Sequence, residues 1–90
     1  MGSRRFDDYD RMTGTGFEGT RTNWAKMDQA TFNHKMDQIA ADWALMADSD
    51  SKVRRVVWFG THPLPHTGRG GQIRRALEEA GIEYWVVPWR

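Results

Sequence analysis

The sequence predicts a small α/β fold with a mixed sheet, whose elements follow one another as β-β-α-β-α-β. The main observation is the run VRRVVWFG at 53–60, which is rich in β-branched and aromatic residues and is followed by the turn residues Thr-His-Pro. A helical pattern over 68–81 and a second strand over 82–87 come directly after it. Strand, helix and strand in succession form a βαβ unit, in which the strands are parallel and the crossover is right-handed.

An acidic hairpin is expected to begin the fold. The segment RRFDDYD predicts one strand, MTGTG supplies a turn with two glycines, and FEGTR predicts the returning strand. If the turn lies at Thr13–Gly16, Glu18 returns opposite the carboxylates of Asp7–Asp10.

A long helix follows the hairpin, with Asp28 or Thr31 as its N-cap. Its expected buried stripe consists of apolar residues at three- and four-residue steps, namely Phe32, Met36, Ile39, Trp43 and Met46. The second helix is expected to bury Ile73, Leu77 and Ala80 and to end at Gly81.

The central strand is expected to be buried on both sides. Val56 to Phe59 are apolar on both faces, which favours layers packed above and below the sheet. Trp43, Trp58 and Trp85 are all expected to lie on buried faces.

Length and composition set bounds on the function. Ninety residues predict a single domain over 1–90. If Met1-Gly2-Ser3 is a cloning remnant, the native chain extends upstream and this domain is the C-terminal piece of a longer chain. The absence of cysteine excludes disulfides and thiolate metal sites. The net charge of +1 does not by itself indicate a nucleic-acid partner. No apolar run has the length of a membrane span, so no membrane partner is expected.

The acidic hairpin is the first candidate site. Carboxylates brought together on adjacent strands repel each other unless a cation bridges them, and oxygen ligands suit Mg²⁺ or Mn²⁺. Asp8, Asp10 and Glu18 are therefore candidate metal ligands. The alternative is a solvated hairpin face that binds nothing.

Two further candidates lie around the loop after the central strand. His62 lies just past the carboxyl end of that strand and, with His66, could act in acid-base chemistry. The glycine-rich start of the second helix could bind phosphate with help from arginines at 69, 74 and 75. The alternatives are a backbone-bonded loop histidine and a flexible loop with solvated arginines.

With these pieces in order, the chain resembles the restriction-endonuclease-like nucleases, and more specifically the toxin domains at the C-terminal ends of bacterial polymorphic toxins. The resemblance rests on RRFDDYD, MTGTG and FEGT, on the helix containing KMDQ, and on VRRVVWFG with GGQIRRALEEAGIEYWVVPW.

The resemblance implies a metal-dependent nuclease. Glu18 matches the family's glutamate, and Asp8, with Asp7 or Asp10 as alternatives, matches its aspartate. The family's lysine position is occupied by Thr20, so Lys26 or Arg21 would replace that lysine. Gln38 matches a glutamine on the following helix. The catalytic residues implied are therefore Asp8, Glu18, Lys26 and Gln38, and Arg21, Arg69, Arg74 and Arg75 would bind nucleic acid.

The resemblance also implies a biological setting. Such a toxin is delivered by a bacterial secretion system, acts in the cytoplasm of the target cell and has a cognate immunity protein. Two other functions stay open: a metal-independent RNase that uses His62 or His66, and a non-catalytic α/β module that binds protein through exposed aromatic side chains.

Overall fold

The computed structural model describes residues 6–88. Its elements in chain order are β1 (Asp8–Asp10), β2 (Thr15–Thr20), the 3₁₀ helix η1 (Trp24–Lys26), α1 (Gln29–Ala47), β3 (Arg55–Gly60), α2 (Gly68–Ala80) and β4 (Glu83–Val86). This order confirms the predicted β-β-α-β-α-β arrangement of a small α/β fold.

The four strands form one mixed sheet in the order β1-β2-β3-β4. β1 is antiparallel to β2, which confirms the N-terminal hairpin, and β3 is parallel to β4, which confirms the βαβ unit. β2 is also parallel to β3, so a second βαβ unit precedes the predicted one and shares β3 with it. The carboxyl ends of β2, β3 and β4 therefore lie at one edge of the sheet, here called the carboxyl edge.

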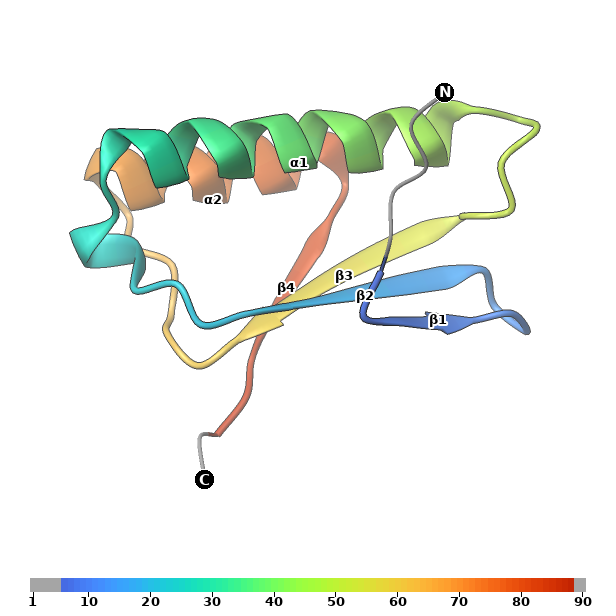
Figure 1. The fold of residues 1–90 in the computed structure, drawn as a ribbon, viewed down its shortest axis with the longest axis horizontal. Coiled ribbons are helices and arrows are strands. Elements are labelled where there is room, and N and C mark those ends of the chain that lie inside the picture. Colours follow the sequence, from blue (N-terminus) through green and yellow to red (C-terminus); the bar gives the residue numbers. More distant parts are fainter. Residues whose placement is uncertain (1–5, 89–90) are drawn as a thin grey trace.

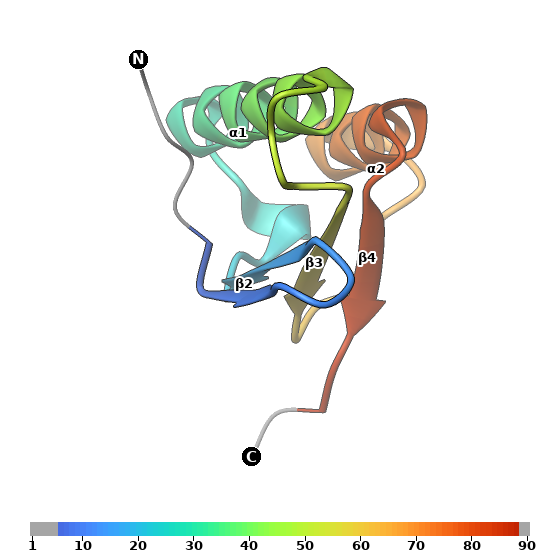
Figure 2. The same cartoon turned by 90° about the vertical axis from the view of Figure 1, so that its right-hand side faces the viewer.

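Both helices cover the same face of the sheet (Figures 1 and 2). The reason is topological: β2, β3 and β4 lie side by side in chain order, and successive right-handed crossovers in one direction place their helices on one side. The expectation of layers on both sides of the central strand is therefore wrong. Val57 is nevertheless fully buried on the open face, where Phe17 is its neighbour on β2 and the Phe17 and Trp85 rings lie 6.0 Å apart.

The core lies between the sheet and the helices. Val56 and Trp58 of β3 meet Ile39 of α1 and Ile73 and Leu77 of α2, and each of these side chains is at most 5% exposed. The predicted burial of Trp58, Ile73 and Leu77 is thus confirmed, whereas Ala80, the third residue of the predicted α2 stripe, is half-buried against the same core.

Two tryptophans expected in the core are exposed instead. Trp43 is 54% exposed because α1 is rotated so that Lys35 and Asp42 face the sheet. Trp85 is 44% exposed because it pairs with Phe59 in register and shares the open face with it.

The ends of α1 and α2 follow local rules. Asp28 is the N-cap of α1, since its Oδ1 accepts a hydrogen bond from the Thr31 backbone N–H at 2.8 Å. This bond lowers the pKa of the Asp28 carboxyl below its ordinary value. α2 is followed by Gly81 in the left-handed conformation at φ 74°.

Candidate functional site

α1 presents three polar side chains to the sheet. Lys35, Gln38 and Asp42 are three and four residues apart, which places them on one side of a helix with about 3.6 residues per turn. Lys35 is 9% exposed and Asp42 is 0% exposed. Charged side chains are seldom buried to this extent unless specific groups compensate them.

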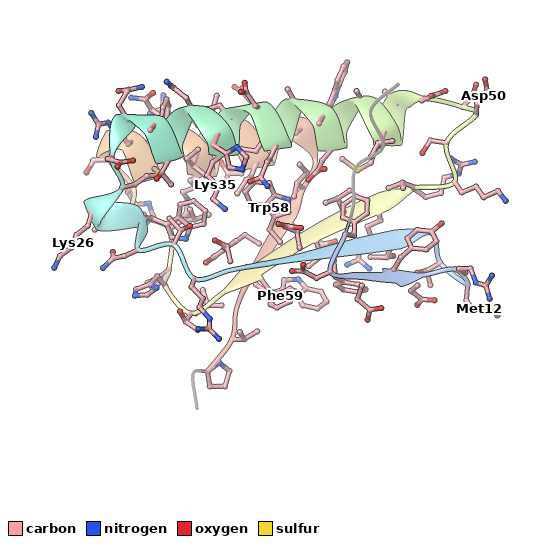
Figure 3. All side chains as sticks on the ribbon, in the orientation of Figure 1. Met12, Lys26, Lys35, Asp50, Trp58 and Phe59 are labelled. Atoms are coloured by element: carbon pink, nitrogen blue, oxygen red, sulfur yellow. The ribbon has the colours of Figure 1, made fainter. Side chains whose placement is uncertain are left out.

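Lys35 lies between α1 and the sheet, close to two indole rings (Figure 3). Its Nζ is 5.9 Å from the centroid of the Trp24 ring and 5.6 Å from that of Trp58, within the range of cation–π attraction. Nζ also donates a hydrogen bond to Oγ1 of Thr20, the last residue of β2, at 3.2 Å. The ammonium group is therefore held at the carboxyl edge.

Asp42 lies two helical turns further along α1 and binds the same tryptophan. Its Oδ2 accepts a hydrogen bond from Nε1 of Trp58 at 2.9 Å, and both side chains are 0% exposed. Trp58 thus connects the two buried charges: its N–H binds Asp42, and Lys35 lies over its ring.

Glu18 lies beside Trp58. The two residues are paired in register across β2 and β3, so their side chains share the face that α1 covers. Glu18 is half-buried. Gln38 carries a buried Oε1 that has no hydrogen-bond partner within residues 6–88. A buried acceptor without a donor costs free energy, so this oxygen favours any group that brings one.

These residues form what we call the buried polar cluster, which consists of Glu18, Thr20, Lys35, Gln38, Asp42 and Trp58. Taking a charged group out of water costs several kcal/mol per ion in proteins, so such a cluster is either a network that specifies the fold or a functional site.

Its position favours a functional site. A surface hollow of about 540 Å³ opens at the carboxyl edge, and its lining includes Arg21, Thr61 and Thr20, the residue whose hydroxyl binds Lys35. Ligands of open α/β sheets bind at this edge.

The acidic hairpin does not gather its carboxylates as expected. Asp8 pairs with Phe17 and Asp10 with Thr15, so both lie on the open face, whereas Glu18 faces the helices. The turn occupies residues 11–14, earlier than predicted. The resulting strand register places the carboxylates of Asp8 and Asp10 on the opposite face of the sheet from Glu18. Asp7, unlike Asp8 and Asp10, binds β2 next to Glu18 in the sequence: its Oδ2 accepts a hydrogen bond from the backbone N–H of Gly19 at 2.7 Å.

The donor set expected for Mg²⁺ or Mn²⁺ is therefore not assembled. Within residues 6–88, no three or more His, Cys, Asp or Glu side chains are grouped so that they could hold a metal ion. Asp8, Asp10 and Glu18 do not fit a single ion, and we assign no ligand set.

Lys26, expected to replace the missing motif lysine, does not join the cluster. It ends η1, is exposed, and points away from the sheet (Figure 3). Lys35 occupies the position near Glu18 and Trp58 instead. Arg21, the other expected substitute, is exposed and lines the carboxyl-edge hollow.

The three arginines of α2 that were expected to bind phosphate are not part of the buried polar cluster. Nη1 of Arg69 donates to the backbone carbonyl of Met27 at 2.9 Å, and Nη1 of Arg74 donates to that of Leu64 at 3.2 Å. These bonds attach α2 to neighbouring loops, while Arg75 is exposed.

The two loop histidines differ in environment. His62 is half-buried, with Nδ1 at 3.1 Å from Oγ1 of Thr61, and its carbonyl accepts a hydrogen bond from the Tyr84 hydroxyl at 2.6 Å. Burial raises the pKa of Tyr84, and the hydrogen bond from the Trp24 indole lowers it by less. His66 is exposed.

Sequence reasoning missed Lys35 and Asp42. Their spacing could have revealed their burial: Lys35 and Asp42 lie four and three residues from Ile39, which was expected to be buried, and therefore on the same side of the helix. Both residues were missed because charged residues are assigned by default to the solvent-facing side of a helix.

Fold and site together define a two-layer α/β domain that carries a buried polar cluster at the carboxyl edge of its sheet. No protein-family model, curated protein or solved structure matches this chain. In the part of the chain that the structure describes, no helix is both long and apolar enough to cross a membrane.

Proposed function

We propose that this chain is a nuclease toxin domain that cleaves phosphodiester bonds in DNA or RNA, with Glu18 and Lys35 at the centre of its active site. The observation that carries the proposal is the burial of Lys35 at the carboxyl edge, over the ring of Trp58, with which the half-buried Glu18 is paired in register. Charged groups buried next to an opening are concentrated at functional sites.

Lys35 supplies positive charge to a bound phosphate. Its ammonium group lies beside two indole rings, and in this water-poor setting it stabilises the charge of the transition state more strongly than a solvated lysine does. Glu18 accepts the proton of the water or hydroxyl group that attacks phosphorus, the P–O bond to the leaving oxygen breaks, and that oxygen takes a proton from solvent. Asp42 acts through Trp58 and is a positioning residue.

The proposal includes the setting that the family resemblance implies. The substrate is nucleic acid, the partner is a cognate immunity protein, and the toxin is delivered by a bacterial secretion system into the cytoplasm of the target cell. Mg²⁺ or Mn²⁺ is the expected cofactor. Because its expected ligands lie on two faces of the sheet, no step is assigned to the ion, and the assay decides metal dependence.

The test compares two lysines. Cleavage of plasmid DNA and of total tRNA is measured with Mg²⁺ and with chelator for the wild type and for Lys35→Met, Glu18→Gln and Lys26→Met. Loss of a group that stabilises transition-state charge lowers the rate about 10²- to 10³-fold. We expect that loss for Lys35→Met and a large loss for Glu18→Gln, while Lys26→Met, which changes an exposed lysine, cleaves as the wild type does.

Thermal unfolding of each variant separates loss of activity from loss of fold. A folded Lys35→Met protein that cleaves at the wild-type rate would contradict the assignment, as would a loss confined to Lys26→Met. Cleavage that persists in chelator and disappears in His62→Ala would favour a metal-independent RNase. No cleavage under any condition would favour a protein-binding module, which the exposed Trp85 and Val86 also suit.

A further inference from the structure

The open face of the sheet meets the carboxyl edge at Phe59. Its side chain lies on the face turned away from the helices, whereas Trp58, the preceding residue, lies between the sheet and α1 (Figure 3). Phe59 is half-buried and lines the carboxyl-edge hollow of about 540 Å³. This volume falls within the range of about 300–1,000 Å³ that is typical of small-molecule sites.

A glycine allows the Phe59 ring to lie close to β2. A Cβ atom on Gly19 would lie 2.8 Å from two atoms of the ring, closer than such atoms can approach. Part of the ring is thereby packed on the backbone of β2, and the ring contributes an apolar surface to the hollow.

The rim of the hollow carries a cation and a fixed acceptor. Arg21 is exposed there, and Asp7 is oriented by the hydrogen bond that its Oδ2 accepts from Gly19 N–H at 2.7 Å. An aromatic side chain stacks on a nucleobase, a guanidinium binds phosphate, and a carboxylate accepts hydrogen bonds from base amino groups. The lining therefore complements the base and the phosphate of a nucleotide.

We propose that the carboxyl-edge hollow binds an unpaired nucleobase stacked on Phe59, so that the nucleic acid bound by this chain is single-stranded. In a duplex each base is stacked between its neighbours, so its faces are not available to Phe59. The inference rests on the proposed nuclease function and deepens it by naming the class of strand.

The test measures binding without turnover. Fluorescence anisotropy in chelator gives the affinity of the wild type for a short labelled oligonucleotide of mixed sequence, for the same sequence as a duplex, and for a strand of equal length with abasic positions. Base–aromatic stacking contributes enough to change affinity roughly 5- to 150-fold per base. We expect the intact single strand to bind more tightly than either of the other two by a factor in this range.

Two variants locate the site. Phe59→Leu keeps an apolar side chain but removes the aromatic ring, and we expect it to bind the intact strand about as weakly as the wild type binds the abasic strand. Trp43→Leu is the matched control, because it removes a 54% exposed aromatic side chain from α1, on the other side of the molecule, and leaves affinity unchanged.

Equal affinity of the wild type for the intact and the abasic strand would refute the inference, and this result requires no variant to fold. Failure to bind any of the three would refute it as well. A protein that cleaves nucleic acid yet binds both single strands equally would retain its proposed function and lose only the nucleobase site. A protein that prefers the intact strand but never cleaves would retain the site and lose the nuclease.

Discussion

Replacement of Asp42 tests whether the buried polar cluster also holds the fold. Asp42→Leu removes the acceptor of the 2.9 Å hydrogen bond from Trp58 and leaves a fully buried indole N–H without it. An unsatisfied buried donor costs about 1–3 kcal/mol. For a domain of this size each kcal/mol lowers Tm by about 4–8 °C, so the expected loss is roughly 4–24 °C.

Asp42→Asn provides the graded comparison. The amide keeps an acceptor oxygen of the same shape but converts a charge-assisted hydrogen bond, worth about 1.5–3 kcal/mol, into a neutral one worth about 0.5–1.5 kcal/mol. The expected loss is therefore about 1 kcal/mol, smaller than that of Asp42→Leu.

Urea unfolding of both variants, of Trp58→Phe and of the Asp42→Leu/Trp58→Phe double variant completes a double-mutant cycle. Because the two side chains share one hydrogen bond, we expect a coupling energy of about 1–3 kcal/mol. Stability of Asp42→Leu equal to or above that of Asp42→Asn, or a coupling energy near zero, would refute the reasoning.

Two predictions concern stability away from the cluster. The Asp28 pKa is lower in the folded than in the unfolded chain, so the N-cap stabilises α1 above the unfolded pKa of about 3.9, and this contribution disappears as the pH falls through the folded pKa. Asp28→Ala should therefore lower Tm at neutral pH, with a difference that shrinks below about pH 4; a difference independent of pH would contradict this. Gly60→Ala would place a Cβ 2.5 Å from Oη of Tyr84 and 2.9 Å from the carbonyl oxygen of Thr20, and such crowding costs about 1–3 kcal/mol. A urea midpoint equal to that of the wild type would show that the sheet adjusts freely there.

The parts of the fold that were predictable from sequence depend on local patterns. The β-branched run at 53–60, Gly14 of the hairpin turn and the Asp28 N-cap each act within a few residues, and the structure has all three, although Gly16 lies in β2 and not in the turn. The open face was not predictable in the same way, because it follows from the spatial order of the strands, which local patterns do not report.

The candidate site was predictable in part. Glu18 and Gln38 were expected from a family resemblance; Glu18 lies on the face of the sheet that α1 covers, and Gln38 lies on α1 with a buried Oε1. The phase of α1 was misjudged because Trp43 offered more apolar surface than Asp42, although Asp42 is the residue that Trp58 binds. Lys26 was expected to replace the motif lysine from the start of the helix, whereas the lysine that binds Thr20 and lies over the Trp58 ring is Lys35, further along α1.

The parallel pairing of β2 with β3 has a consequence for how the chain folds. The β1–β2 hairpin joins neighbouring segments and can form within microseconds, but it holds only Glu18 and Thr20 of the buried polar cluster. The cluster gains Lys35, Gln38 and Asp42 only when α1 has packed on the sheet. It gains Trp58 only when β3 has paired with β2, which brings together two strands separated by the whole of α1. Such non-local closure is the slow part of folding. A chain arrested before that step would have its hairpin but not its cluster, so the proposed chemistry belongs to the fully folded chain alone.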